Sequence, residues 1–268
     1  MLSIGIDSGS TATKGILFSD ENGGVILRRF LIPTPFRPQS AILEAWETLC
    51  GECDTRPYLT LTGYGRKLAD FADKQVTEIS CHGIGARWLH PQTRTVIDIG
   101  GQDSKVIRLD EQGHLTDFLM NDKCAAGTGR FLDVISRTLG TDITAVDDTI
   151  RGIEPHAISS MCTVFAESEV ISLRSAGVEP ESILSGIVNS MAQRTAGFAK
   201  RLSTLPSVLF SGGVSRSQVF CEHLSQHLGA EVITHPDGQF AGAIGAAIYG
   251  IRQLQKQAAS AAGISVYE

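Results

Sequence analysis

A glycine-containing turn between two short apolar runs occurs twice in this chain, with an aspartate before the turn and a lysine after it. The first copy runs from Asp7 to Lys14 and follows the apolar residues 2–6. The second copy runs from Asp98 to Lys105 and follows residues 95–97. Apolar runs that flank such a turn predict a strand, a hairpin and a second strand. Two copies of one unit predict a duplicated fold, in which two similar α/β lobes face one another across a cleft.

The rest of the chain divides around this repeat. Residues 1–92 are expected to form the first lobe and residues 93–240 the second, which carries two of the cysteines discussed below. A helix rich in small residues, about 241–268, is expected to pack back on the first lobe. Apolar spacing and stop signals predict the remaining elements. The expected helices are 40–49, 67–73, 79–89, 125–139, 163–175, 183–202 and 241–257, and the expected buried strand is 207–210.

Composition excludes several classes of protein. The 268 residues are 42% hydrophobic and 19% charged, with a net charge of -6 and no basic block, so a nucleic-acid partner is not expected. No apolar run approaches the roughly 20 residues of a membrane helix, and the first residues lack a secretory pattern. We therefore expect a cytoplasmic protein without a membrane partner. In that reducing compartment its six cysteines are ligands, redox groups or core residues, not disulfides.

The first turn has the composition of a phosphate-binding loop. Glycine allows the backbone to approach a bulky anion, and backbone N–H groups, hydroxyls and a lysine donate to its oxygens. Asp7 ends the strand and is expected to hold Mg²⁺ through water and to act in catalysis. A tight hairpin with a solvated lysine has the same pattern. The residues expected to contact the nucleotide are Gly9, Ser10, Thr11, Ala12, Thr13 and Lys14.

The second turn and a later glycine pair favour the nucleotide interpretation. Gln102 and Asp103 are candidates for ordering an attacking water, because phosphoryl transfer depends on positioning and charge neutralisation. A buried strand ends at a further glycine pair, on which an adenosine could lie. The glycines expected to contact the nucleotide are Gly100, Gly101, Gly127, Gly212 and Gly213. Three such motifs in this order resemble the actin, heat-shock chaperone and sugar-kinase superfamily, which implies two ribonuclease-H-like (actin-like ATPase) lobes around a nucleotide cleft.

Two cysteines, Cys124 and Cys162, each come directly before a predicted helix. The partial positive charge of a helix N-terminus stabilises anionic sulfur, so both are candidate thiolates. A [4Fe–4S] cluster takes four cysteines, and a two-fold dimer would supply two from each subunit. Small buried thiols are the more common outcome for free cysteines, and spacing alone favours that reading.

The segments around these cysteines, 121–133 and 158–172, are similar to those of the activator component of 2-hydroxyacyl-CoA dehydratases. That component belongs to the BadF/BadG/BcrA/BcrD ATPase family, which includes ATPase subunits of benzoyl-CoA reductase. Residues 7–14, 62–66, 96–105 and 211–214 resemble the same family. The resemblance implies a homodimer in which Cys124 and Cys162 of both subunits hold one [4Fe–4S] cluster. It also implies ATP-driven transfer of single electrons from ferredoxin or flavodoxin to a dehydratase.

The other candidate residues carry weaker signals. Cys50 and Cys53 have the spacing of a metal pair without a second pair, and Cys81 and Cys221 are expected to pack in cores. His156 is either a hydrogen-bonding neighbour of the cluster or a solvated loop residue. Glu167 and Glu169 either link the cluster helix to the nucleotide or stabilise a helix N-terminus.

Two other functions fit parts of the pattern. A sugar or acid kinase of the same superfamily would transfer phosphate without a cluster, although no acceptor-binding insert is evident. An ATP-dependent scaffold would bind nucleotide without electron flow. In the favoured hypothesis, nucleotide binding shifts the helices that follow Cys124 and Cys162, and hydrolysis resets them.

Overall fold

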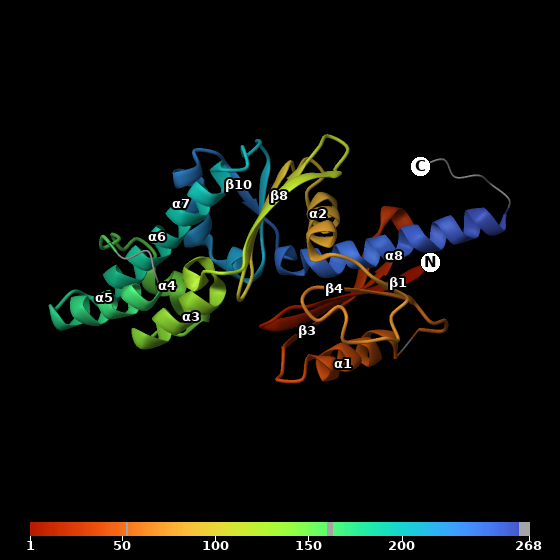
Figure 1. Ribbon diagram of the computed structural model, residues 1–268, viewed down its shortest axis with the longest axis horizontal. Coiled ribbons are helices and arrows are strands. Elements are labelled where there is room, and N and C mark those ends of the chain that lie inside the picture. The colour runs from red at the N-terminus through yellow and green to blue at the C-terminus, as the bar shows by residue number, and fades with distance from the viewer. Residues whose placement is uncertain (52, 160–162, 263–268) are drawn as a thin grey trace. The chain divides into compact units, whose positions relative to one another are not determined.

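The computed structural model describes residues 1–51, 53–159 and 163–262. The chain divides into two compact units (Figure 1). The first contains residues 1–91 and the C-terminal segment from residue 240, and the second contains residues 92–239. Each unit has its own sheet and its own buried core.

The first unit is built on a five-stranded sheet with the order β3-β2-β1-β4-β5. Strand β1 pairs antiparallel with β2 and parallel with β4, so the first hairpin lies at the centre of the sheet. Helices α1 and α2 belong to the same unit. The bounds are β1 (Leu2–Ser8), β2 (Ala12–Ser19), η1 (Glu21–Gly23), β3 (Val25–Pro33), α1 (Pro38–Cys50), β4 (Tyr58–Thr62), β5 (Lys74–Gln75) and α2 (Glu78–Leu89).

The second unit repeats this topology with the order β10-β9-β6-β7-β8. Strand β6 pairs antiparallel with β7 and parallel with β9, as β1 does with β2 and β4. The sheet strands are β6 (Thr95–Ile99), β7 (Ser104–Leu109), β8 (Leu115–Asn121), β9 (Val208–Ser211) and β10 (Val232–Thr234). The helices and turns are η2 (Ala125–Gly127), α3 (Gly129–Thr138), η3 (Ile143–Ala145), α4 (Val146–Ile150), α5 (Thr163–Ser175), α6 (Pro180–Lys200), η4 (Gly213–Arg216) and α7 (Gln218–Leu228). The duplicated hairpins thus occupy equivalent places in two copies of one sheet.

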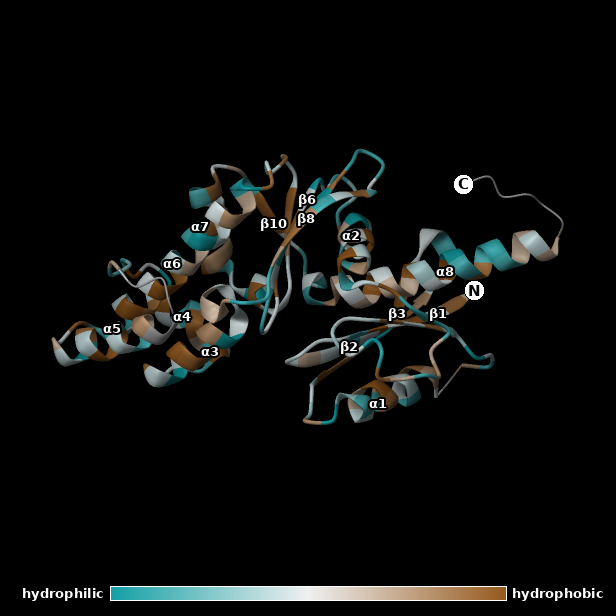
Figure 2. Cartoon of the chain, viewed as in Figure 1, coloured by the Kyte–Doolittle hydropathy of each residue, from teal (hydrophilic) through white to brown (hydrophobic). Residues whose placement is uncertain are grey.

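Helix α8 (Ala241–Ala261) follows η5 (Gly238–Phe240) and packs on β1 and α2, so closely that the backbones of α8 and α2 are in contact. A Cβ atom on Gly245 would collide with the carbonyl of Cys81, and one on Gly85 would collide with the carbonyl of Ala241. Only glycine allows so close an approach of two helices. The turns of α8 after residue 251 are largely exposed, and Figure 2 shows hydrophilic colours there before the light-brown, alanine-rich last turn.

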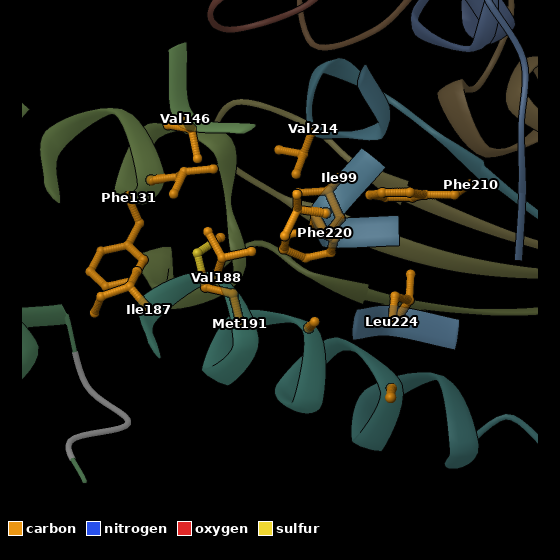
Figure 3. Close-up of a cluster of buried hydrophobic side chains, with 14 of the residues drawn as sticks. Ile99, Phe131, Val146, Ile187, Val188, Met191, Phe210, Val214, Phe220 and Leu224 are labelled. Carbon is orange, nitrogen blue, oxygen red and sulfur yellow. The ribbon is translucent and has the colours of Figure 1, made fainter. Parts of the chain in front are cut away.

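The core of the second unit lies between its sheet and helices α3, α6 and α7. Figure 3 shows Phe210 of β9 and Phe220 of α7 side by side, and their rings stack with centroids 5.4 Å apart. Phe131 of α3 and Met191 of α6 belong to the same cluster. This packing fixes the ends of β6 and β9, which lead directly into the candidate glycines Gly100 and Gly212.

Two predicted helices differ from the structure. Residues 67–73 form turns instead of a helix. The Asp73 carboxylate accepts hydrogen bonds from the Leu59 amide and from Arg56, which holds the segment against β4. A helix of seven residues is also too short to be stable without tertiary contacts. The predicted helix 125–139 is broken at Thr128, whose backbone is extended. Thr128 is the N-cap of α3, and its side-chain oxygen accepts a hydrogen bond from the Phe131 amide. No helix among the described residues is both long and apolar enough to cross a membrane.

Candidate functional site

The first loop joins β1 to β2 and presents its polar residues to solvent. Ser10 and Thr11 are exposed, and the Gly9 amide donates to the carbonyl of Ala12 at 3.2 Å. Thr34 supports the loop by donating its hydroxyl to the carbonyl of Gly9 at 2.8 Å, and it lies 2.9 Å from the hydroxyl of the buried Thr13. The loop is therefore held in shape while its tip keeps hydroxyls and amides available to an anion.

Asp7 lies at the end of β1 directly opposite Lys14 in the hairpin, and Lys14 Nζ is 3.2 Å from Asp7 Oδ2. Asp7 is 2% exposed, and its Oδ1 is buried with no hydrogen-bond partner among the described residues. Gly63 and Gly242 border this carboxylate, since a Cβ on Gly63 would collide with Oδ1 and one on Gly242 would lie 2.9 Å from Oδ2. A buried carboxylate oxygen that lacks a donor fits a hydrated Mg²⁺.

The equivalent aspartate of the second unit has a different environment. Asp98 accepts a hydrogen bond from Ser211 Oγ at 2.7 Å, and Lys105 Nζ lies 3.5 Å from its other oxygen. Lys105 is 1% exposed and also pairs with Asp103 at 2.9 Å. Asp98 therefore holds a buried network together. Of the two residues predicted to order water, Asp103 belongs to this network, and Gln102 has an exposed side chain.

The second loop is joined by backbone hydrogen bonds to the segment that follows Cys124. The amides of Gly129 and Arg130 donate to the carbonyls of Gly100 and Gly101 at 2.9 and 3.0 Å. A Cβ on Gly129 would lie 3.3 Å from both the Gly100 oxygen and Val214 Cγ2. The loop, the start of α3 and the glycine pair after β9 thus form one assembly within the second unit.

The remaining predicted glycines lie in the same assembly. Gly212 has a φ of 87°, a left-handed conformation that favours glycine, and a Cβ there would collide with the Ile99 carbonyl. Gly213 has open space around its Cα, and Gly127 is buried beside Ser104 and Asn121. Gly212 therefore shapes the turn, and Gly213 leaves room for a ligand.

Cys124 is half-buried and directly precedes η2, four residues before the N-cap of α3. Asn121 Nδ2 donates to its carbonyl at 3.0 Å, and Arg194 of α6 donates from Nη2 to its sulfur at 3.1 Å. A partly accessible sulfur in contact with a guanidinium donor is suited to act as a metal ligand. Cys162, the other predicted ligand, lies outside the described residues.

The other cysteines are less suited to ligation. Cys81 is fully buried, and burial raises the pKa of its thiol to about 12. Burial also raises the pKa of Cys221, whose sulfur donates to the carbonyl of Val232 at 3.3 Å. Cys50 and Cys53 pack against the core of the first unit. The described residues contain no group of three or more histidine, cysteine or acidic side chains placed for a metal, so a cluster would need ligands beyond these.

Two of the open alternatives concern the segment before α5. Glu169 Oε1 accepts hydrogen bonds from the amide and the hydroxyl of Ser159, at 2.8 and 2.7 Å. This acid therefore ties the chain just before the undescribed residues to α5. The amide of His156 donates to the carbonyl of Ser182, which fixes that loop against α6.

Several residues of this site gave no signal of their own in the sequence. Ser211 and Arg194 act through contacts with residues that are far away along the chain. His82, buried on α2, has Cε1 2.8 Å from the position that a Cβ on Gly242 would take, beside Asp7. The glycines of residues 62–66 were visible as a motif, but their place around Asp7 and Ser8 follows only from the parallel pairing of β1 with β4.

Comparisons with known proteins agree on one family. The model described as the BadF/BadG/BcrA/BcrD ATPase family matches residues 4–250. The Escherichia coli K12 protein YjiL, described as uncharacterized, is 69% identical over 250 residues, covering 93% of this chain and 97% of that protein. The (R)-2-hydroxyglutaryl-CoA dehydratase activating ATPase of Acidaminococcus fermentans is 43% identical over 258 residues, covering 94% of this chain and 98% of that protein.

Solved structures give the same result. The activator of the 2-hydroxyisocaproyl-CoA dehydratase from Clostridium difficile, with bound ADPNP, has a TM-score of 0.89 at 39% identity and covers 100% of both chains. A ROK family glucokinase from Streptomyces griseus has a TM-score of 0.60 at 15% identity, covering 94% of this chain and 100% of that one, and shows a shared fold alone. The predicted actin-like fold class is thereby confirmed. The chain belongs to the BadF/BadG/BcrA/BcrD ATPase family.

Proposed function

We propose that this protein is an ATP-hydrolysing activator that transfers single electrons to an enzyme of the 2-hydroxyacyl-CoA dehydratase type. The observation that carries the proposal is the hydrogen-bonded assembly of the second loop with the segment of Cys124, which joins a nucleotide-type loop to a candidate electron-transfer ligand. Relatives named as activators of such dehydratases align with nearly the whole chain at about the same identity, which supports the same role.

The nucleotide residues are assigned by their chemistry. Exposed hydroxyls and amides between Gly9 and Lys14, together with the glycines of the second loop, are proposed to bind the phosphates of ATP and ADP. Asp7 is proposed to hold Mg²⁺ through water, because its buried Oδ1 lacks a donor among the described residues. Asp103 and Gln102 are proposed to orient water, and Gly212 and Gly213 to flank the adenosine.

The cluster is proposed to lie between two copies of the chain, with Cys124 and Cys162 of each as ligands. A [4Fe–4S] cluster held there would supply reversible one-electron transfer at low potential. Cys124 fits the role of a ligand, since its thiol is free and half-buried and accepts a hydrogen bond from Arg194. Ferredoxin or flavodoxin is the proposed electron donor.

Coupling between the nucleotide and the cysteine follows from the backbone hydrogen bonds at Gly129 and Arg130. A loop that closes on phosphate would pull the carbonyls of Gly100 and Gly101, and with them the start of α3. Cys124, five residues before Gly129, lies on the same stretch of chain. If this segment has two conformations, ATP would favour the one in which the loop is closed on the phosphates, and the position of Cys124 would change with it.

A kinase function is not favoured. The glucokinase shares 15% sequence identity with this chain, whereas the dehydratase activators share about 40% or more. Fold similarity without local sequence similarity does not carry function.

The test is anaerobic purification followed by iron and sulfide analysis of the wild type, Cys124→Ser and Cys162→Ser. We expect a brown wild type with iron and sulfide in equal amounts, and loss of both in each variant. Cys53→Ser is the matched control, because Cys53 is another half-buried cysteine but packs against the core of the first unit. An iron-free wild type, or full iron in either ligand variant, would refute the proposed role.

A further inference from the structure

Arg194 contacts the candidate cluster ligand Cys124 from a different element of the chain. It lies on α6, 70 positions after Cys124 in sequence, and its Nη2 donates to the Cys124 sulfur at 3.1 Å. Both side chains are partly buried, so the contact is screened less than a surface pair. A guanidinium is always charged and presents several donors in a fixed plane, and is therefore suited to hold one sulfur at a constant position.

The surroundings of Arg194 keep it close to the sulfur. Helix α6 is anchored in the core by Met191, which is 2% exposed, and by other buried residues on the same face. Arg194 also borders a small hollow lined by Ala126 of η2 and Ala166 of α5. The side chain of Arg194 therefore starts from a helix that is anchored in the core, and it borders the hollow where η2 and α5 approach α6.

We propose that Arg194 is a positioning residue that tunes the iron–sulfur cluster by hydrogen bonding to the Cys124 ligand and thereby raises its reduction potential. This inference rests on the proposed function above. Reduction adds one negative charge to a cluster and its thiolates, and a cationic N–H donor stabilises the more negative state. Two-fold symmetry would place one such arginine beside the Cys124 ligand of each subunit.

The size of the effect follows from the contact. A hydrogen bond from a charged donor strengthens as the negative charge on its acceptor grows, so part of its stabilisation depends on the oxidation state of the cluster. We expect Arg194→Gln to lower the ratio of reduced to oxidised cluster at a fixed potential about tenfold, which is ~59 mV for a one-electron couple. Arg194→Lys keeps the charge on a shorter side chain, and we expect a smaller shift in the same direction.

The experiment is a redox titration of the anaerobically purified dimer, followed by electron paramagnetic resonance of the reduced cluster. Arg201→Gln is the matched control, because Arg201 lies at the C-terminal end of the same helix and stacks on Phe198. We expect wild-type potential and spectrum in the control. Iron content is measured first in every variant, so that potentials are compared only between loaded proteins.

Each outcome is decisive. A more negative potential in Arg194→Gln, with partial recovery in Arg194→Lys and none of the shift in Arg201→Gln, supports the proposal. An iron-loaded Arg194→Gln protein with the wild-type potential overturns it and leaves the proposed function intact. Should Arg194→Gln not retain iron, an unshifted potential in loaded Arg194→Lys overturns it. A wild type without iron overturns both.

Discussion

Replacing Lys105 with methionine tests whether the second hairpin is held by a buried ion network. Lys105 is 1% exposed and lies 3.5 Å from Asp98 and 2.9 Å from Asp103, so one ammonium group compensates two carboxylates. Methionine has nearly the same shape but no charge. Removing one partner of a buried pair typically costs about 3–5 kcal/mol, because the opposite charge stays buried. For a unit of this size we expect the unfolding temperature to fall by about 6–20 °C.

The assay is thermal unfolding followed by circular dichroism and by tryptophan fluorescence. Both tryptophans, Trp46 and Trp88, belong to the first unit, so fluorescence reports that unit while circular dichroism reports the whole chain. Lys14→Met is the matched variant, because Lys14 occupies the equivalent hairpin position but is 17% exposed and lies near one carboxylate, Asp7. We expect a smaller loss there. A Lys105→Met protein within about 1 kcal/mol of wild type, or less affected than Lys14→Met, would refute the network.

Three further predictions follow from other contacts. Gly245→Ala should lower the free energy of unfolding by about 1–3 kcal/mol, because the new methyl group would collide with the Cys81 carbonyl. Gly197→Ala, on α6 with open space around it, should be neutral or stabilising. Urea titration of both variants tests this. Burial raises the pKa of Cys81 from 9.0 to about 12, so between these values the folded protein keeps a proton that the unfolded chain releases. This contribution to stability is complete below pH 9 and is lost as the pH rises toward 12. The urea midpoint of Cys81→Ala should therefore decline less steeply over that range than that of the wild type, and equal slopes would contradict the assignment. Asp7→Asn should reduce ATP hydrolysis about a hundredfold while leaving the iron content unchanged, and a phosphate-release assay with undiminished turnover would remove Asp7 from the catalytic site.

The parts of the fold that could be predicted are those with local signals. The hairpins at Asp7–Lys14 and Asp98–Lys105 are visible because each depends on neighbouring residues, apolar runs and a turn. Helix α8 is visible through its small residues. The break at Thr128 was missed, because the apolar spacing continues across it and only the threonine side chain caps α3.

The parts of the site that could not be predicted depend on contacts across long sequence distances. Arg194 reaches Cys124, and Ser211 reaches Asp98, only after α6 and β9 have packed in the second unit. The two aspartates occupy the same position in similar motifs, but Ser211 donates to Asp98, whereas Asp7 Oδ1 has no hydrogen-bond partner among the described residues. Similar local motifs therefore acquire different surroundings from residues that belong to other elements.

The central claim is that one cluster is shared by two chains, and native mass spectrometry under anaerobic conditions tests it most directly. We expect the wild type to appear as a dimer whose mass exceeds that of two chains by one [4Fe–4S] unit, and Cys124→Ser to lack that added mass. Monomers that each carry a complete cluster, or a wild-type dimer without added iron and sulfide, would contradict the claim.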